Sequence, residues 1–242
     1  MKIMIIRHGD PDYSIDSLTE KGWREAEMLS ERIAPLVVKQ YYVSPLGRAR
    51  DTASFTLKKA GREAEVLPWL REYDVRIDDP VTGMKRIPWD MLPADWTAVP
   101  EYYQRNGWYN VPVMKSAGME AGLKAVWDGL DEILARHGYR RDGLVYRAEK
   151  PNEDTIVFFC HFGVQCVMLG HLFGVSPMIL WHSLMTAPTS VTTICSEERR
   201  EGTAFFRASA IGDISHLYAK GEPPAFAGRF CEMFSNEEQR HD

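Results

Sequence analysis

The sequence predicts an α/β fold in which helices cover both faces of a mostly parallel central sheet, so that the domain has three layers (α/β/α). Two compact apolar runs, at residues 2–6 and 155–160, are typical of buried parallel strands. Segments with helical spacing alternate with these runs along the chain. Such alternation requires crossover connections, which place helices on the two faces of the sheet.

The first seventy residues contain clear helix and strand signals. A polar loop with Pro11 follows the first strand, and Thr19 is expected to cap a helix that ends near Pro35. Gly61 is expected to close the next helix. The other elements expected here are a strand at 41–44, a helix at about 46–60 and a short strand at 65–67.

Residues from about 73 to 118 form a segment of different character, rich in proline and in aromatic side chains. Inserts of this length in compact domains are usually lids, binding loops or short-helix excursions. The aromatic content predicts that the segment packs and is not disordered. We therefore expect a single domain over 1–242, with an insert or cap at about 73–118.

The remainder of the chain returns to regular elements. Asp142-Gly143 is a strong signal for a two-residue hairpin turn. The elements expected here are a helix at 119–136, a hairpin over 139–146, a strand at 155–160, a helix to about 173, and late strands near 190–195 and 204–209.

The composition excludes some classes of protein. The net charge of −5 argues against a general nucleic-acid binder, which would show a basic surplus. The apolar run before Arg7 is too short for a signal peptide or a membrane span. None of the four cysteines forms a CxxC pair, and Cys160 and Cys166 are expected to be reduced core residues. We expect a soluble cytoplasmic protein that binds neither nucleic acid nor membrane.

Basic side chains follow three of the predicted strands. The first strand ends at Arg7-His8-Gly9, the strand at 155–160 ends at His161, and Arg48 lies in the first turn of the helix after a third strand. Ligands of open α/β sheets bind at the carboxyl ends of the strands. If the two apolar strands are neighbours, both histidines and both arginines reach one rim.

This set of side chains suits a phosphate group. Guanidinium groups bind phosphoryl oxygens in a bidentate manner and stay charged at any working pH. Imidazole can act as a covalent nucleophile, and nearby arginines lower the pKa of a histidine so that it stays neutral and reactive.

The sequence resembles the histidine phosphatase superfamily, which shares the phosphoglycerate mutase-like fold. The motifs that carry the resemblance occur in the family's order and span most of the chain outside the 73–118 segment. They are Arg7-His8-Gly9, Leu18-Thr19-Glu20-Lys21-Gly22, the run Ser44-Pro45-Leu46-Gly47-Arg48 with its continuation to Ala53, Leu70-Arg71-Glu72, His161, and Gly212-Asp213-Ile214-Ser215-His216-Leu217.

The resemblance implies a phosphatase of the small bacterial type that forms a phosphohistidine on His8. It implies that Arg7, Arg48 and His161 bind the phosphoryl oxygens together with His8, and that Glu72 is the proton donor and later the base. It implies no metal and no cofactor, since arginines and histidines supply the positive charge. The partner is then a small-molecule phosphate ester. The oligomeric state stays open, with a homodimer among the expected assemblies.

Several positions depart from the family's usual pattern. Asp10-Pro11 follows the first motif, Glu25 stands where glutamine is usual, and Phe162 follows the second histidine in place of glycine. Because the usual continuation after Glu72 is missing, Asp10 and Asp74 remain alternative proton donors. Two other functions also remain: a phosphoglycerate mutase-type transferase, and a non-catalytic phospholigand-binding protein on the same fold.

A second copy of the Arg-His-Gly tripeptide, Arg136-His137-Gly138, serves as an internal control. It lies at the end of a predicted amphipathic helix, where a basic residue followed by glycine is an ordinary C-terminal cap. We interpret it as structural. The position of the first copy, and not the tripeptide itself, therefore supports a catalytic role for His8.

Overall fold

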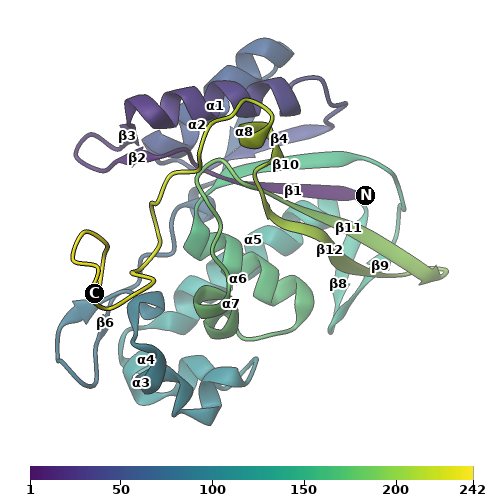
Figure 1. Cartoon of the computed structure of the whole chain (residues 1–242). Coiled ribbons are helices and arrows are strands. Elements are labelled where there is room, and N and C mark those ends of the chain that lie inside the picture. Colours follow the sequence, from purple (N-terminus) through teal and green to yellow (C-terminus); the bar gives the residue numbers. More distant parts are fainter. Residues whose placement is uncertain (242) are drawn as a thin grey trace.

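The computed structural model describes residues 1–241 as a central sheet with helices on both of its faces (Figure 1). The strands are β1 (Lys2–Arg7), β2 (Pro11–Asp12), β3 (Ser17–Leu18), β4 (Gln40–Val43), β5 (Ala64–Val66), β6 (Ile77–Asp78), β7 (Lys85–Arg86), β8 (Tyr139–Asp142), β9 (Val145–Ala148), β10 (Thr155–Cys160), β11 (Val191–Arg200) and β12 (Thr203–Asp213). The α-helices are α1 (Glu20–Ile33), α2 (Gly47–Ala60), α3 (Pro93–Thr97), α4 (Pro112–Ser116), α5 (Met119–Arg136), α6 (Phe162–Phe173), α7 (Pro177–Ser183) and α8 (Ser215–Tyr218). Short 3₁₀ helices are η1 (Pro68–Leu70), η2 (Pro88–Asp90), η3 (Pro100–Tyr103) and η4 (Trp108–Asn110).

The main sheet has a parallel part and an antiparallel part. Within residues 1–241 its strand order is β5-β4-β10-β1-β11-β12-β9-β8. The first four strands are parallel, and helices connect β1 to β4 and β4 to β5, whereas β11, β12, β9 and β8 are joined through antiparallel pairs. The predicted α/β fold is confirmed as a large mixed sheet with helices around it.

Strand β1 lies at the centre of this sheet and contributes to a core on each face. Its side chains alternate, so Ile3 and Ile5 pack with residues of α5 and α6, while Met4 and Ile6 pack with residues of α1 and α2. Figure 1 shows α1, α2 and α8 above the sheet and α5, α6 and α7 below it. With both of its faces covered, β1 holds the residues that follow it in a fixed position.

The helix ends agree with the sequence signals. The Thr19 side chain accepts a hydrogen bond from the Gly22 amide at the start of α1, and Gly61 takes the left-handed conformation after α2. The hairpin β8–β9 turns at Gly143-Leu144, one position later than the Asp142-Gly143 signal suggested. The turn begins at Gly143 because this position has a φ of +60°, which favours glycine.

The 73–118 segment packs against α5, α6 and α7 through short elements, from β6 to α4. Trp96, Tyr102, Trp108, Met91 and Met114 are buried in the core on that face of the sheet. The segment is thus a packed layer, as its aromatic content predicted.

The late strands β11 and β12 are longer than predicted, and residues 198–201 at the turn between them are polar and exposed. The start of β12 pairs with β9, so this hairpin is part of the main sheet. Beyond α8, residues 219–241 form no further helix or strand and run along one side of the molecule to the insert (Figure 1). This C-terminal segment is fastened by the ion pairs Lys21–Glu222 and Arg240–Asp90, both 2.5 Å long. No helix in the described part of the chain is both long enough and apolar enough to cross a bilayer.

Candidate active site

The two histidines lie side by side because their strands are neighbours. Strands β1 and β10 pair in parallel with Arg7 opposite Cys160, and the next residues are His8 and His161. The His8 amide donates to the Cys160 carbonyl at 2.9 Å, and the two imidazole centroids are 5.1 Å apart. The distance between the imidazoles is therefore close to the spacing of adjacent strands, about 4.8 Å.

The His8 imidazole is held in one tautomer. Its Nδ1 lies 2.7 Å from the Gly9 carbonyl, which can only accept, so Nδ1 carries the proton and Nε2 keeps its lone pair. Burial, and then the positive charge of Arg7, hold the pKa of His8 well below its ordinary value. His8 is consequently a neutral imidazole at physiological pH, with Nε2 available as a nucleophile.

The Arg7 guanidinium is buried beside the C-terminal segment. Its Nη1 donates to the Thr186 carbonyl at 2.5 Å and to the Ala227 carbonyl at 3.3 Å. Its Nε is also buried and has no acceptor among residues 1–241. Because two elements hold one end of the group, the remaining donors have a fixed direction.

Arg48, in the first turn of α2, is positioned by an acid that the sequence analysis did not select. Asp16 Oδ1 accepts from Arg48 Nη1 at 2.5 Å, and Oδ2 accepts from the Gly47 amide at 2.7 Å. Asp16 thus caps α2 as well as pairing with Arg48. Its φ of +49° is unusual for a residue other than glycine. Arg48 Nε is buried without an acceptor in the described chain.

His161 is oriented by Ser44 at the end of β4. The Ser44 hydroxyl lies 2.7 Å from His161 Nε2, while Nδ1 is buried and has no hydrogen-bond partner within residues 1–241. Burial, followed by the charge of His8 and of Arg48, holds the pKa of His161 well below its ordinary value. If the serine hydroxyl donates to Nε2, the proton of the neutral ring is on Nδ1, which is then a free donor.

Glu72 lies at the N-terminus of α6. Its Oε1 accepts from the Val164 amide at 3.2 Å and from the Tyr73 amide at 2.8 Å. Burial raises the pKa of Glu72, against the opposing effects of the Tyr73 amide and the Arg7 charge. A carboxyl group in this environment keeps its proton to higher pH than an exposed glutamate.

The two alternative acids are placed differently. The Asp10 carboxylate accepts from the Thr19 hydroxyl at 2.7 Å, at the start of α1. Asp74 is 61% exposed and lies 4.0 Å from Arg71. Of the three candidate acids, Glu72 is the one whose side chain bonds to the helix that follows His161.

A glycine pair fixes the loop after His8. A Cβ atom at Gly9 would lie 2.8 Å from the Gly22 carbonyl, so the loop packs backbone to backbone against α1. Glycine at both positions permits this contact because neither residue has a Cβ, and no local sequence pattern signals it. Beneath the loop, the carboxylate of Glu25 is fully buried and accepts from the Asp10 amide at 3.0 Å. Burial raises the pKa of Glu25 to about 7.

The second tripeptide is structural. His137 is the C-cap of α5 and hydrogen-bonds to the Tyr42 hydroxyl at 2.9 Å, while Arg136 pairs with Glu65 and Glu132 on the surface.

Within the described residues, no group of three or more His, Cys, Asp or Glu side chains could hold a metal ion.

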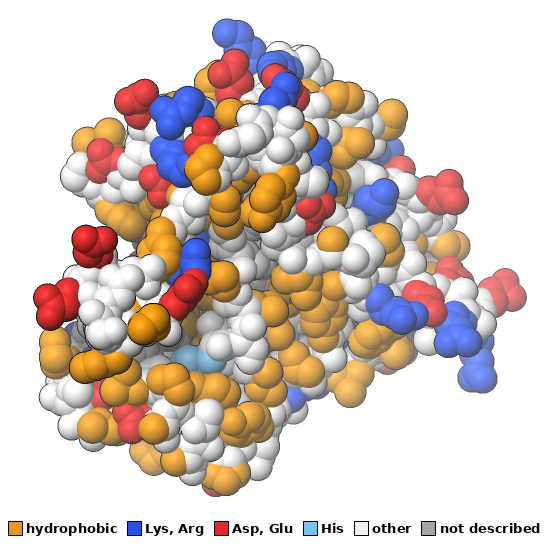
Figure 2. All heavy atoms as spheres, in the orientation of Figure 1, with side chains coloured by type: hydrophobic (Ala, Val, Ile, Leu, Met, Phe, Trp, Pro, Cys, Tyr) orange, Lys and Arg blue, Asp and Glu red, His pale blue; other side chains and the backbone are white. Residues whose placement is uncertain are grey.

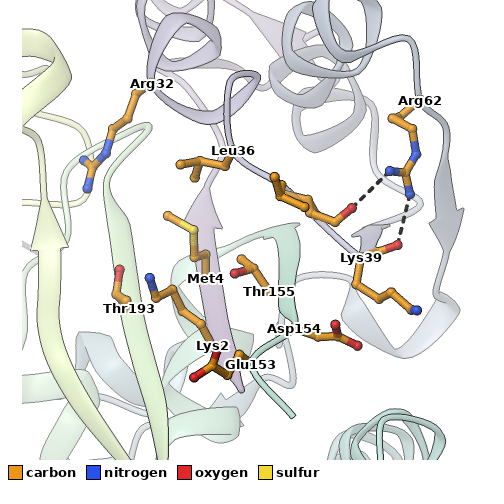
Figure 3. A pocket seen from close by; sticks show the side chains of 12 residues that line it. Lys2, Met4, Arg32, Leu36, Lys39, Arg62, Glu153, Asp154, Thr155 and Thr193 are labelled. Atoms are coloured by element: carbon orange, nitrogen blue, oxygen red, sulfur yellow. Dashed lines mark hydrogen bonds between the residues drawn. The ribbon is translucent and has the colours of Figure 1, made fainter.

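A cavity of about 730 Å³ lies at the opposite end of the parallel strands (Figure 3). Its walls include Lys2 and Thr155, the first residues of β1 and β10, whereas His8 and His161 follow the last. Arg62 beside it donates to the carbonyls of Val38 and Lys39. This cavity is therefore separate from the histidines.

Sequence reasoning missed Asp16, and it missed Trp89, which packs near Glu72. An acid just before the Leu18-Thr19 motif could have suggested a partner for an arginine, since a buried guanidinium needs one. For Trp89 the local sequence offers no comparable signal, because its neighbours come from α6 and α7.

Comparisons with known proteins bear on the family and on the fold of this chain. Residues 3–207 match the family described as "Histidine phosphatase superfamily (branch 1)". A 2,3-bisphosphoglycerate-dependent phosphoglycerate mutase of Thermoplasma acidophilum is 41% identical over 64 residues, which cover 22% of this chain and 32% of the mutase. The match to that relative thus spans only about a third of its length.

Two further proteins match over most of the chain. A Schizosaccharomyces pombe protein named as a probable phosphatase is 25% identical over 233 residues, or 90% of this chain and 95% of that protein. The crystal structure of a phosphoserine phosphatase mutant from Entamoeba histolytica, in complex with phosphoserine, has a TM-score of 0.59 at 19% identity. It covers 89% of this chain and 98% of its own, which shows a shared fold. Together with the match over residues 3–207, these findings show that the chain belongs to the histidine phosphatase superfamily.

Proposed function

We propose that this protein is a phosphatase that hydrolyses phosphate monoesters through a phosphohistidine on His8, as a single domain with residues 73–118 as its cap. One observation carries the proposal. The neutral His8 lies beside buried nitrogens of Arg7, Arg48 and His161 that have no hydrogen-bond partner within residues 1–241. A phosphoryl group supplies oxygens of the kind that such donors require.

In the first half-reaction, His8 Nε2 attacks phosphorus while the bond to the leaving oxygen breaks. Glu72 gives its proton to that oxygen, so the alcohol leaves neutral. Arg7, Arg48 and His161 bind the three phosphoryl oxygens, whose charge is spread in the transition state. The raised pKa of Glu72 supports this role, because the acid must hold its proton near neutral pH.

In the second half-reaction, Glu72 removes a proton from water, and the resulting nucleophile attacks the phosphohistidine. The N–P bond breaks, inorganic phosphate forms and His8 is again neutral. Arg7 and Arg48 supply the positive charge throughout, and the neutral His161 supplies a hydrogen bond, so the proposed chemistry uses no metal and no cofactor.

A direct test is the hydrolysis of 4-nitrophenyl phosphate in the presence of EDTA. We expect turnover that vanadate inhibits and that His8→Ala lowers by about 10³-fold or more. His137→Ala is the matched control, since it removes the histidine of the second tripeptide, and it should retain the activity. Full activity of His8→Ala would refute the proposal. Phosphate binding without turnover on any ester would favour a non-catalytic binding protein.

A mutase remains the second candidate, supported by the local similarity to the Thermoplasma acidophilum enzyme. The two functions share the phosphohistidine and differ in whether water or a second hydroxyl accepts the phosphoryl group. Interconversion of phosphoglycerates that is stimulated by bisphosphoglycerate, and faster than release of phosphate, would favour the mutase.

A further inference from the structure

We propose that Trp89 and Phe162 form an aromatic wall that selects phosphate esters with a flat, apolar leaving alcohol. The inference rests on the proposed function, because it concerns the side of the site at which Glu72 would protonate the leaving oxygen.

The position of Trp89 next to Glu72 is fixed by the lack of a side chain at Gly163. A methyl group at Gly163 would lie 2.6 Å from Glu72 Oε1 and even closer to Trp89 Cη2. The indole edge and the carboxyl oxygen therefore pack on the same side of the first turn of α6. A leaving oxygen that reaches the Glu72 proton places its carbon substituent beside this indole.

The wall is rigid because buried aromatic rings support it. The Trp181 indole N–H donates to the Gly163 carbonyl at 3.0 Å, and its ring lies 5.3 Å from that of Trp89. Phe162 meets Trp89 edge to face at 6.3 Å and 89°. Trp181 is only 3% exposed, whereas Trp89 and Phe162 are partly exposed. The exposed portions of these two rings are the surface available to a substrate.

Two cations that precede Trp89 in the chain are paired with acids. Lys85 pairs with Asp78 at 2.7 Å, and Arg86 pairs with the buried Asp79 at 3.2 Å. The cations that precede Trp89 in the chain are thus already neutralised by acids. On the face of the molecule shown in Figure 2, hydrophobic side chains outnumber charged ones in the lower part.

Position 162 adds an independent observation. Phe162 directly follows His161, so its ring is attached to the backbone that also carries one of the expected phosphate-binding groups. An apolar side chain there gives an aromatic leaving group a second surface, at right angles to the first. Contacts between aromatic rings of this kind are favourable beyond the area that they bury.

The experiment compares aryl phosphates whose leaving phenols are of similar acidity but differ in apolar area and in whether they carry ionised groups: 2-naphthyl phosphate, phenyl phosphate and O-phosphotyrosine, which has an ammonium and a carboxylate. We expect wild-type kcat/KM to be about tenfold higher for 2-naphthyl phosphate than for phosphotyrosine. Trp89→Ala should remove most of this preference by lowering the 2-naphthyl value, and Trp89→Phe should restore part of it. The control is Trp127→Phe, since Trp127 stacks on His171 instead and its replacement should leave the preference unchanged.

Each outcome has a separate meaning. Equal wild-type kcat/KM for all three esters would overturn the inference without any variant, even if Trp89→Ala failed to fold. An equal loss on all three esters in Trp89→Ala, at unchanged Tm, would also overturn it, because the indole would then support catalysis without distinguishing the leaving alcohols. Absence of turnover on every ester by the wild type would instead contradict the proposed function.

Discussion

The phosphate side and the leaving-group side of the candidate site are built from different kinds of structure. His8 and His161 follow adjacent strands, and their separation is set by the backbone of the sheet. Trp89 comes from a short 3₁₀ helix of the insert and is held by aromatic packing against α6 and α7. We infer that the phosphate side determines the chemistry, whereas the leaving-group side determines which alcohol is released.

Glu72 lies where the two sides meet, and its replacement should have the largest effect of the three changes considered next. In Glu72→Gln the acceptor for the Val164 amide remains but the proton is lost. We expect kcat for an alkyl phosphate to fall about 10²-fold and kcat for 4-nitrophenyl phosphate much less, because nitrophenolate leaves without a proton. Since burial raises the pKa of Glu72, the fall of wild-type activity at high pH should begin above the ordinary glutamate range and be absent in the variant.

Two variants control for this change. Asp74→Asn and Asp10→Asn remove the alternative acids and should keep the dependence on the leaving group. If Asp74→Asn instead shows the selective loss on the alkyl ester, Asp74 and not Glu72 is the proton donor. The leaving-group side of the site would then lie next to Asp74.

Replacing Asp16 should affect the phosphate side alone. Asp16→Ala frees the Arg48 guanidinium and removes the cap of α2, so we expect kcat/KM to fall about tenfold, by the same factor for every leaving group. Asp16→Asn keeps an acceptor for the Gly47 amide and should recover part of the activity. Asp12→Ala is the control, because this partly exposed carboxylate in the same loop accepts hydrogen bonds from the amide and the hydroxyl of Ser14 instead. If the loss of kcat/KM in Asp16→Ala varied with the leaving group, Asp16 would not act on the phosphate side alone.

Glu25 should affect stability with little effect on either side of the site. A carboxyl whose pKa rises from 4.5 in the unfolded chain to about 7 in the folded protein binds its proton more tightly when folded. Its contribution is therefore favourable below about pH 4.5 and is lost as the pH rises to about 7, a change on the order of 3 kcal/mol.

The Glu25→Gln variant does not titrate and keeps an oxygen for the Asp10 amide. Relative to the wild type it should become more stable between pH 5 and pH 8, as measured by urea unfolding. Glu27→Gln, on the exposed face of the same helix, should follow the wild type. A constant difference between Glu25→Gln and wild type over this range would contradict the assigned titration.

The sequence was sufficient to predict the fold class and the rim on which the histidines lie, because both depend on local patterns. The apolar runs that become β1 and β10 are buried on both faces, and a residue directly after such a strand lies at the edge of the sheet. The roles assigned to His8, Arg48, His161 and Glu72 remain predictions for the experiments above.

The leaving-group side could not be predicted in the same way. Trp89 lies beside Glu72 only because Gly163 leaves room and because Trp181 supports the indole from another helix. Such contacts depend on side chains that are distant in sequence and follow no period. The Asp16–Arg48 pair was missed for a related reason, since it depends on a left-handed backbone conformation at Asp16 in an irregular loop.

The backbone hydrogen bonds around His8 have a consequence for hydrogen exchange. The amides of His8 and Thr189 bond to carbonyls of the central sheet region, and the Gly9 amide bonds to the Thr52 hydroxyl. Amides held in this way exchange with deuterium only when a large cooperative unit unfolds. The amides of the short turns in the insert exchange through local opening, which costs less free energy. Mild heating or denaturant should therefore deuterate the 73–118 segment first, and the protein should lose its choice of alcohol before it loses the nucleophile.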